Sequence, residues 1–295
     1  GMRTATEYKL AEIRTIIENH KDECEPELKE ALEAYVANQK DRQYARSVKA
    51  QIMDLVRASS SEGIKALLDH ERDFVNKSVW IVGGDGWSYD IGYGGVDHVL
   101  AQEEDVNILV LDTEVYSNTG GQASKSTRTG AVAKFAAGGK DVAKKNLAKM
   151  ALSYPHVYVG TISLGANQMQ AIKVMKEAEA YDGPSIIIAY APCIAHGILK
   201  GMKNSIAEEK EATASGYFPL FHYNPQNREF KLDSNGTVVG KTVNGVNTIY
   251  GVEGTDYIAE ITGDDTIIYM YDVEANVIGF TYNGKEYTND YLKEH

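Results

Sequence analysis

Between residues 77 and 225, short runs of apolar and β-branched residues alternate with longer stretches of helical periodicity. Four such runs predict strands at 79–82, 106–111, 157–162 and 185–189. Helices are predicted between them at 91–101, 142–152 and 167–181. This β-α-β-α order is typical of an α/β fold, a parallel sheet flanked by helices on both faces. Any ligand site is therefore expected beyond the carboxyl ends of the strands.

Regions of different character flank this segment. Residues 1–76 are rich in Glu, Lys, Arg, Ala and Leu and predict two or three amphipathic helices, with Pro26 in the first turn of the second. From Asn227 onwards tyrosines recur, and Asn-Gly pairs at 235–236, 244–245 and 283–284 predict hairpin turns. Strands of an antiparallel meander are expected at 237–239, 248–252, 257–261, 266–271 and 277–282. We therefore expect a helical segment packed on the next domain (1–76), an α/β domain (77–233) and a small acidic β-rich C-terminal unit (234–295).

Composition narrows the class of protein. The 295 residues carry a formal net charge of −12, which argues against nucleic acid or an acidic membrane surface as the main partner. The two cysteines, Cys24 and Cys193, provide no disulfide framework and no self-contained metal site. No apolar stretch approaches the length of a membrane span, and the first 30 residues are charged rather than signal-like. A cytoplasmic protein is expected. Its opening Gly1-Met2 suits either a tag remnant or an internal starting point in a longer protein.

Polar residues follow the first two predicted strands, in VGGDGW at 82–87 and LDTEVYSNTGG at 111–121. If these strands are parallel neighbours, Asp85, the hydroxyl of Thr113 and backbone carbonyls surround one point. Mg²⁺ prefers oxygen ligands, few of them from protein and the rest from phosphate and water. The glycines beside Asp85 let phosphate oxygens approach the backbone, and the helix predicted from Ile91 offers its positive end to an anion. The pattern predicts Mg²⁺ bound to a diphosphate.

Competing interpretations of the Gly-Asp-Gly turn are weaker. Such a turn is common, and only the second polar element at the end of the next strand makes it informative. Residues 83–86 lack the Gly-x-Gly-x-x-Gly spacing of dinucleotide-binding proteins, and no Walker lysine follows the turn. General thiamine-diphosphate enzymes carry a Gly-Asp-Gly and, one strand-helix-strand interval later, an Asn that completes the magnesium site. Here Thr113 stands in that place.

The stretch from Trp80 to about Asn227 closely resembles the thiamine-binding C-terminal domain of pyruvate:ferredoxin (flavodoxin) oxidoreductases. The resemblance rests on GGDGWSYDIGYGGVDHVLAQEEDVNILVLDTEVYSNTGGQASKST, on SLGANQMQ at 163–170 and on YAPCIAHGI at 190–198. Residues 1–76 also resemble the segment that precedes this domain. The implied magnesium contacts are Asp85, the hydroxyl of Thr113 and the carbonyl of Val115. The implied diphosphate and thiazolium contacts are Gly84, Asp85, Gly86, Trp87, Ser117 and Asn118.

This resemblance implies an oxidoreductase of anaerobic metabolism that binds thiamine diphosphate and Mg²⁺. It would decarboxylate pyruvate oxidatively and form acetyl-CoA with coenzyme A. Electrons would pass through iron–sulfur clusters to ferredoxin or flavodoxin, and the family suggests a homodimer. Asn118 either serves catalysis by hydrogen-bonding the cofactor or an intermediate oxygen, or merely caps the following turn. Without the pyrimidine-side and cluster-binding domains or subunits the chain is expected to be inactive; alternatively, it is a non-catalytic descendant that binds a cofactor or a protein.

Cys193 follows the last predicted strand, where a single cysteine is usually a small packing residue. In the family, however, the Tyr-Ala-Pro-Cys segment gives one thiolate to a [4Fe–4S] cluster. Such a cluster needs four thiolates, and the family's other ligands have no counterpart here. Cys24 lies among acidic residues that disfavour a thiolate. The chain is therefore not expected to hold a cluster by itself, and its sequence beyond Asp233 departs from the family's C-terminal extension.

Five further polar residues lie near these motifs. Lys125, Arg128 and Lys134 follow the second loop and either face coenzyme A phosphates or an acidic ferredoxin, or belong to a solvated loop. His98 and His196 lie beside the motifs, where a lone histidine is more often a hydrogen-bonded structural residue.

Overall fold

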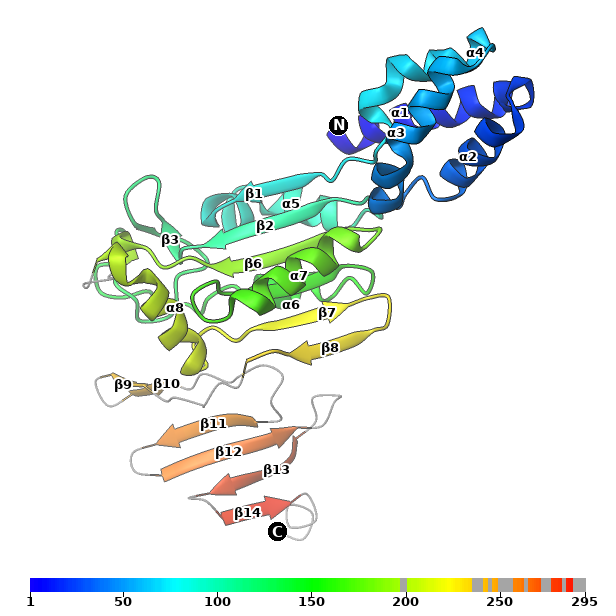
Figure 1. Cartoon of the computed structure of the whole chain (residues 1–295). Helices are drawn as coiled ribbons and strands as arrows, with labels where there is room; N and C mark the ends of the chain where they lie inside the picture. Colours follow the sequence, from blue (N-terminus) through cyan, green and yellow to red (C-terminus); the bar gives the residue numbers. More distant parts are fainter. Residues whose placement is uncertain are drawn as a thin grey trace. The chain divides into compact units, whose positions relative to one another are not determined.

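The computed structural model describes residues 1–196 and 201–234, together with the backbone of six short strands between residues 241 and 288. The chain forms two compact units, Gly1–Val79 and Trp80–His295. Figure 1 shows the whole chain with its helices and strands labelled. Over the described ranges, every helix is too short or too polar to cross a bilayer.

The first unit is helical, as expected. Its helices are α1 (Met2–His20), α2 (Pro26–Ala37), α3 (Arg42–Ala58) and α4 (Glu62–Lys65), with 3₁₀ turns at Lys21–Glu23 and Ala66–Asp73. Pro26 occupies the first position of α2, where its missing N–H costs nothing. Tyr35 and Phe74 stack at 3.8 Å between ring centroids inside the unit, and the Tyr35 hydroxyl donates to the Phe74 carbonyl at 2.7 Å. The apolar faces of these helices thus pack together into one hydrophobic core within the first unit.

A six-stranded sheet forms the framework of the second unit. Its strands are β1 (Trp80–Gly83), β2 (Asn107–Asp112), β5 (Tyr158–Ile162), β6 (Ser185–Tyr190), β7 (Phe221–Asn224) and β8 (Glu229–Leu232), in the order β1-β2-β6-β5-β7-β8. The first four in this order run parallel, which confirms the predicted sheet and its four strands to within one residue. β7 and β8 extend the sheet antiparallel. The sequence analysis predicted neither β7 nor β8 as a strand, although both lie within the α/β domain expected over residues 77–233.

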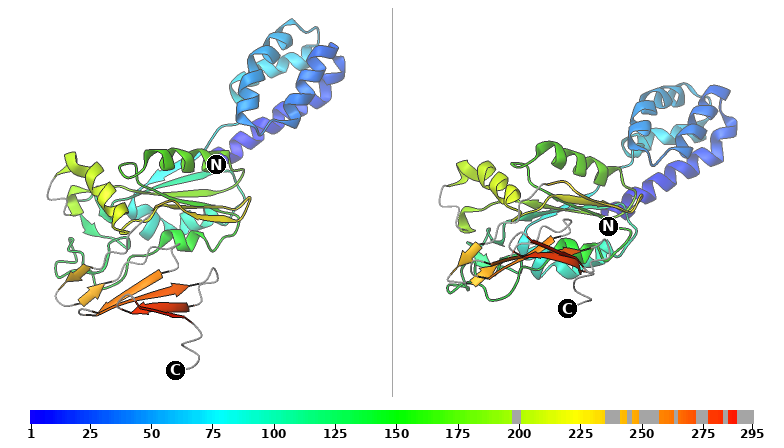
Figure 2. Two further views of the ribbon diagram at one scale, coloured as in Figure 1. Left: turned by 60° about the horizontal axis from the view of Figure 1, so that its bottom comes forward. Right: turned by 90° about the horizontal axis from the view of Figure 1, so that it is seen from below.

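Helices cover both faces of this sheet (Figure 2). Alternating residues of β6 point to opposite sides, because side chains along a strand alternate. Ile186 packs in the cluster that includes α5 (Tyr93–Leu100) and α6 (Leu147–Ala151), whereas Ile187 packs with α7 (Gln168–Ala180). The central strands β5 and β6 are buried on both faces, so their sequences are mostly apolar runs.

Two predicted helices have different bounds in the structure. The helix expected over 142–152 is only α6, and Asn146 begins it by accepting a hydrogen bond from the Lys149 N–H at 2.8 Å. The helix expected from Ile91 begins at Tyr93. A π-helical turn at Gly86–Asp90 precedes it and directly follows the Gly-Asp-Gly turn. A further helix, α8 (Ser205–Ala214), lies between β6 and β7 along the chain.

Toward the C-terminus the described residues are short strands. β9 (Lys241–Val243) and β10 (Val246–Thr248) pair with each other, and β11 (Tyr257–Thr262), β12 (Asp265–Tyr271), β13 (Val277–Tyr282) and β14 (Lys285–Thr288) form an antiparallel sheet. Val243 pairs with Val246, and Tyr282 with Lys285, in antiparallel register, whereas the Asn-Gly pairs at 244–245 and 283–284 lie outside the described residues. The strand expected at 237–239, and residues 249–252 of another, lie outside the described residues.

Candidate functional site

Three neighbouring parallel strands bring the predicted site residues to one edge of the sheet. β1 pairs with β2 up to Gly83 and Val110, and β2 pairs with β6 up to Asp112 and Tyr190. In Figure 1 the arrowheads of β2 and β6 point to the same side. Segments far apart in sequence therefore leave the sheet together, and polar side chains in these loops are available to a shared ligand.

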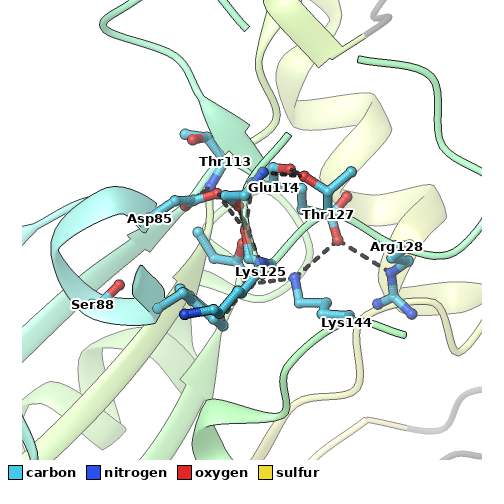
Figure 3. Close-up of polar contacts among 12 residues, drawn as sticks. Asp85, Ser88, Thr113, Glu114, Lys125, Thr127, Arg128 and Lys144 are labelled. Carbon is cyan, nitrogen blue, oxygen red and sulfur yellow. Dashed lines mark hydrogen bonds and ion pairs between the residues drawn. The ribbon is translucent and has the colours of Figure 1, made fainter. Parts of the chain in front are cut away.

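Thr113 contacts both Asp85 and Val115. The backbone N–H of Thr113 donates to Asp85 Oδ1 at 3.0 Å, and the Thr113 hydroxyl donates to the Val115 carbonyl oxygen at 2.9 Å. Figure 3 shows the side chains of Asp85 and Thr113 beside each other. The structure thus brings together the carboxylate, the alcohol and the carbonyl that the sequence singled out.

Asp85 is an almost fully buried carboxylate, 3% exposed. Its Oδ2 accepts hydrogen bonds from the hydroxyls of Ser124, at 3.0 Å, and of Ser126. Burial, together with the negative charge of Asp112, raises the pKa of Asp85 to about 7. A buried carboxylate with a raised pKa gains stability when a cation arrives, because the cation favours its charged form.

The donor atoms suit a hard divalent cation. Within the ranges that the structure describes, no three His, Cys, Asp or Glu side chains cluster in the way that an all-side-chain metal site requires. A cation beside Asp85 would instead use one carboxylate, the Thr113 hydroxyl and the Val115 carbonyl, with other ligands from outside the protein. Mg²⁺ characteristically binds in this way, since it retains water and phosphate oxygens.

Gly83, directly before the Gly-Asp-Gly turn, and Gly86 within it allow aromatic rings to pack closely beside Asp85. A Cβ on Gly83 would lie 2.4 Å from the Trp87 ring, and one on Gly86 would lie 3.3 Å from the Tyr116 ring. Gly84 accepts hydrogen bonds at its carbonyl from the Ser88 N–H and hydroxyl, at 3.0 and 2.9 Å. The expected contacts Gly84, Gly86 and Trp87 therefore all belong to one tight turn that ends in the π-helical turn.

Ser117 and Asn118 lie in the loop after β3 (Val115–Tyr116), which pairs with β4 (Gln122–Ala123). The Ser117 hydroxyl oxygen is buried and has no hydrogen-bond partner among the described residues. Such an orphaned group suits contact with a molecule that binds from outside. Asn118 is exposed beside it, in the same turn.

The segment after β6 reaches this same loop. A Cβ on Gly121, whose φ is +90°, would lie 2.9 Å from the carbonyl oxygen of Ala195. Cys193 is a half-buried free thiol, and its sulfur accepts from the Ala195 N–H at 3.4 Å. Burial and the carboxylates of Glu25 and Glu23 raise the pKa of the other thiol, Cys24, which confirms that its surroundings disfavour a thiolate.

Sequence reasoning missed a buried ion-pair cluster next to Thr113. Glu114 is 1% exposed, and its Oε1 pairs with Arg128 Nε at 3.1 Å and with Lys144 Nζ at 3.0 Å. Its Oε2 accepts from the Tyr217 hydroxyl at 2.6 Å. Lys144 also pairs with Asp112, which accepts a further hydrogen bond from Tyr89 at 2.8 Å. The signal in the sequence was the pair of acidic residues that flank Thr113 directly after an apolar strand.

Charge governs protonation in this cluster. Burial by itself would raise the pKa of Glu114, but the positive charges of Lys144 and Arg128 lower it to about 2. Burial likewise lowers the pKa of Lys144, but Asp112 and Glu114 raise it above its usual range. Glu114 and Lys144 therefore both carry their full charges near neutral pH.

Basic and histidine residues near the motifs have distinct surroundings. Arg128 was expected to face a ligand or solvent; instead it packs over the Tyr217 ring at 3.8 Å and pairs with Glu114. Lys125 pairs loosely with Asp90 at 3.6 Å, and Lys134 is exposed. His98 is exposed on α5. His196 Nε2 lies 3.7 Å from Glu114 Oε2, and burial lowers its pKa.

The fold and the site together define the class of protein. Residues 30–189 match the family of thiamine pyrophosphate enzymes, C-terminal TPP binding domain, and the chain belongs to this family.

Among curated proteins, the chain is 51% identical over 235 residues to pyruvate:ferredoxin oxidoreductase from Moorella thermoacetica, covering 77% of this chain and 20% of that protein. It is 50% identical to pyruvate-flavodoxin oxidoreductase from Klebsiella pneumoniae, covering 70% of this chain and 18% of that protein. The chain thus spans about a fifth of the length of these relatives. A solved structure, 2-oxoglutarate:ferredoxin oxidoreductase from Magnetococcus marinus with 2-oxoglutarate, coenzyme A and succinyl-CoA bound, is 22% identical, with a TM-score of 0.38, and covers 41% of this chain and 42% of that one. The resemblance expected from the motifs is confirmed: the chain is a thiamine-diphosphate-binding domain homologous to the pyruvate:ferredoxin and pyruvate-flavodoxin oxidoreductases.

Proposed function

We propose that this chain holds the Mg²⁺ and diphosphate of thiamine diphosphate in a pyruvate:ferredoxin or pyruvate-flavodoxin oxidoreductase. The observation that carries the proposal is that Thr113, after the end of β2, contacts both Asp85 Oδ1, through its backbone N–H, and the Val115 carbonyl, through its hydroxyl. Asp85, the Thr113 hydroxyl and the Val115 carbonyl would each give one oxygen to the cation. When bound, thiamine diphosphate supplies the electron sink for decarboxylation of a 2-oxoacid.

The surrounding loops would position the rest of the cofactor. Backbone groups from Gly84 to Trp87 would approach the diphosphate closely, because Gly84 and Gly86 have no Cβ. The Ser117 hydroxyl would donate to the cofactor, because this oxygen has no partner in the described chain. Asn118, exposed in the same turn, would hydrogen-bond the cofactor or an oxygen of the reacting substrate. We assign it the catalytic role on that basis.

In the whole protein, this site would support oxidative decarboxylation of pyruvate and formation of acetyl-CoA. Coenzyme A and ferredoxin or flavodoxin would be partners, together with domains or subunits that complete the cofactor site, in a cytoplasmic homodimer. Cys193 lies on the segment after β6, where Ala195 packs against Gly121 in the loop after β3. This position supports a role for Cys193 as one of four thiolates around a [4Fe–4S] cluster. The other thiolates would come from outside this chain.

The experiment is a thermal unfolding series with Mg²⁺ and thiamine diphosphate. A ligand that binds only the folded state stabilises it by about 2.7 kcal/mol at a hundredfold excess over its Kd. The melting temperature of the natural chain should therefore rise, and Asp85→Ala should abolish the rise. Asp97→Ala is the matched control, because it removes a carboxylate on α5 that accepts a hydrogen bond from the Tyr154 hydroxyl. This variant should keep the rise in melting temperature. A melting temperature of the natural chain that does not change when Mg²⁺ and thiamine diphosphate are added would refute the proposed cofactor site.

A further inference from the structure

Glu114 is the residue between two of the proposed cation ligands, and its backbone has an uncommon conformation. Its φ is +62°, in the left-handed region that residues other than glycine rarely adopt. Strain of this kind persists only where surrounding contacts hold the residue in place. The chain turns at Glu114, and the Thr113 hydroxyl on one side of this turn reaches the Val115 carbonyl on the other side at 2.9 Å.

Contacts from three distant segments hold Glu114 in this conformation. The Thr127 hydroxyl donates to its backbone carbonyl. Arg128 and Lys144 pair with its carboxylate at 3.1 and 3.0 Å, and the Tyr217 hydroxyl donates to the same carboxylate at 2.6 Å (Figure 3 shows the first three of these residues). A buried carboxylate with this many partners is fixed in position.

The same cluster supports Asp85. Arg128 lies on the loop that also carries Ser124 and Ser126, whose hydroxyls bind Asp85 Oδ2. The Ser124 N–H also donates to the Thr127 hydroxyl oxygen at 2.9 Å. The Arg128–Glu114 pair therefore ties the loop that orients Asp85 to the residue that orients Thr113 and Val115.

Charge balance gives this cluster a second effect. The carboxylates of Asp112 and Glu114 flank Thr113, and Lys144 pairs with both of them. Arg128 supplies a second positive charge. The positive charges of Lys144 and Arg128 thus offset the carboxylates of Asp112 and Glu114. Asp85 forms no ion pair among the residues that the structure describes, so its carboxylate remains available to a metal ion.

We propose that Glu114 is a positioning residue for the cation site, and that its contacts with Arg128, Lys144 and Tyr217 hold Thr113 and Val115 in the arrangement that binds Mg²⁺. Glu114 itself does not touch the cation. This inference rests on the proposed function, since it concerns the same site. Groups that orient metal ligands without touching the metal typically change its affinity about 10- to 100-fold when removed.

Two tyrosine substitutions separate positioning from stability. Tyr217→Phe removes the hydroxyl that donates to Glu114. Tyr158→Phe, on β5, is the control and removes the hydroxyl that donates to Glu177 at 2.9 Å. Mn²⁺ is added in place of Mg²⁺ to the full chain with thiamine diphosphate, and bound Mn²⁺ is measured by electron paramagnetic resonance. We expect about tenfold weaker Mn²⁺ binding for Tyr217→Phe and wild-type binding for Tyr158→Phe. Equal Mn²⁺ affinities in the two variants would overturn the inference.

Glu114→Gln tests the carboxylate itself, with its folding checked by circular dichroism. If it folds, Mn²⁺ affinity should fall about 10- to 100-fold, and unchanged affinity would overturn the inference. If it does not fold, the comparison of the two tyrosine variants decides. Failure of the proposed function looks different, because the natural chain would then bind no Mn²⁺ with thiamine diphosphate. Tight binding by the natural chain that Asp85→Ala removes and Tyr217→Phe leaves unchanged would refute the positioning role alone.

Discussion

Trp87 packs between two glycines beside the candidate site. A Cβ on Gly83 would lie 2.4 Å from its ring, and a Cβ on Gly92 would lie 2.5 Å from its ring and from its carbonyl oxygen. Real side chains do not approach so closely, so the indole has this position because both neighbours lack a Cβ. Since Trp87 directly follows the Gly-Asp-Gly turn, its packing also fixes where that turn lies.

Replacing Gly83 with alanine should therefore destabilise the second unit. The added methyl group overpacks the Trp87 site, and such insertions typically cost about 1–3 kcal/mol. Gly95→Ala is the matched control, because a Cβ there meets nothing within 4 Å and alanine is favoured in a helix by up to about 1 kcal/mol. Urea unfolding should show opposite changes in the free energy of unfolding. Similar changes in the two variants would contradict this account of Trp87.

Individual site residues differ in how well the sequence predicts their neighbours. Asp85 and Thr113 could be placed together because both directly follow strands, and adjacent parallel strands end at one edge. The partners of Glu114 could not be placed, since Arg128, Lys144 and Tyr217 are 14, 30 and 103 residues away along the chain. The left-handed backbone of Glu114 is equally invisible in a sequence that has no glycine at that position.

At the scale of elements, the SLGANQMQ motif forms the junction between β5 and α7. Asn167 is the N-cap of α7, and its side-chain oxygen accepts from the Gln170 N–H at 3.0 Å. Glu209 on α8 accepts from the Ser163 hydroxyl at 3.0 Å and from the Gly165 N–H at 2.7 Å. Ser163 and Asn167, the two small polar residues of the motif, thus each make a hydrogen bond that holds the connection between β5 and α7.

Asn167→Ala should cost about 1 kcal/mol in the free energy of unfolding, because it leaves the Gln170 N–H without its capping acceptor. Asn167→Asp keeps an acceptor oxygen in the same place and should lose much less. Denaturant unfolding of the three chains measures the difference. An aspartate variant as unstable as the alanine variant would show that capping is not what Asn167 contributes.

Elements were predictable where burial gave them an apolar run or a helical period, and they were missed where tertiary contacts decided. The four parallel strands each contain a run of mostly apolar residues, whereas β8 is mostly exposed and carries little hydrophobic signal. Residues 142–146 have a helix-like composition, yet they do not continue α6. Lys144 in this stretch instead enters the buried ion pairs with Asp112 and Glu114, and these outweigh a small helix propensity.

Considered as a whole, the molecule has hydrophobic cores on each side of the boundary at Val79. The core of the first unit consists of residues from Ile13 to Phe74, and the clusters of the second unit lie between Trp80 and Leu232. The family match runs from residue 30 to residue 189 and so crosses this boundary. Sequence texture indicated the change at residue 76, because charged helical periodicity gives way there to β-branched runs.

A core confined to the first unit predicts that residues 1–79 fold without the rest of the chain. Domains of this size bury enough apolar surface for marginal but cooperative stability. The isolated segment should show helical circular dichroism and a sigmoidal thermal transition. Within it, Ile52→Ala should lower the free energy of unfolding by about 2–5 kcal/mol because Ile52 is 1% exposed, whereas Met2→Ala, at a position 78% exposed, should change it little. A non-cooperative transition that neither substitution alters would mean that this core needs the second unit to form.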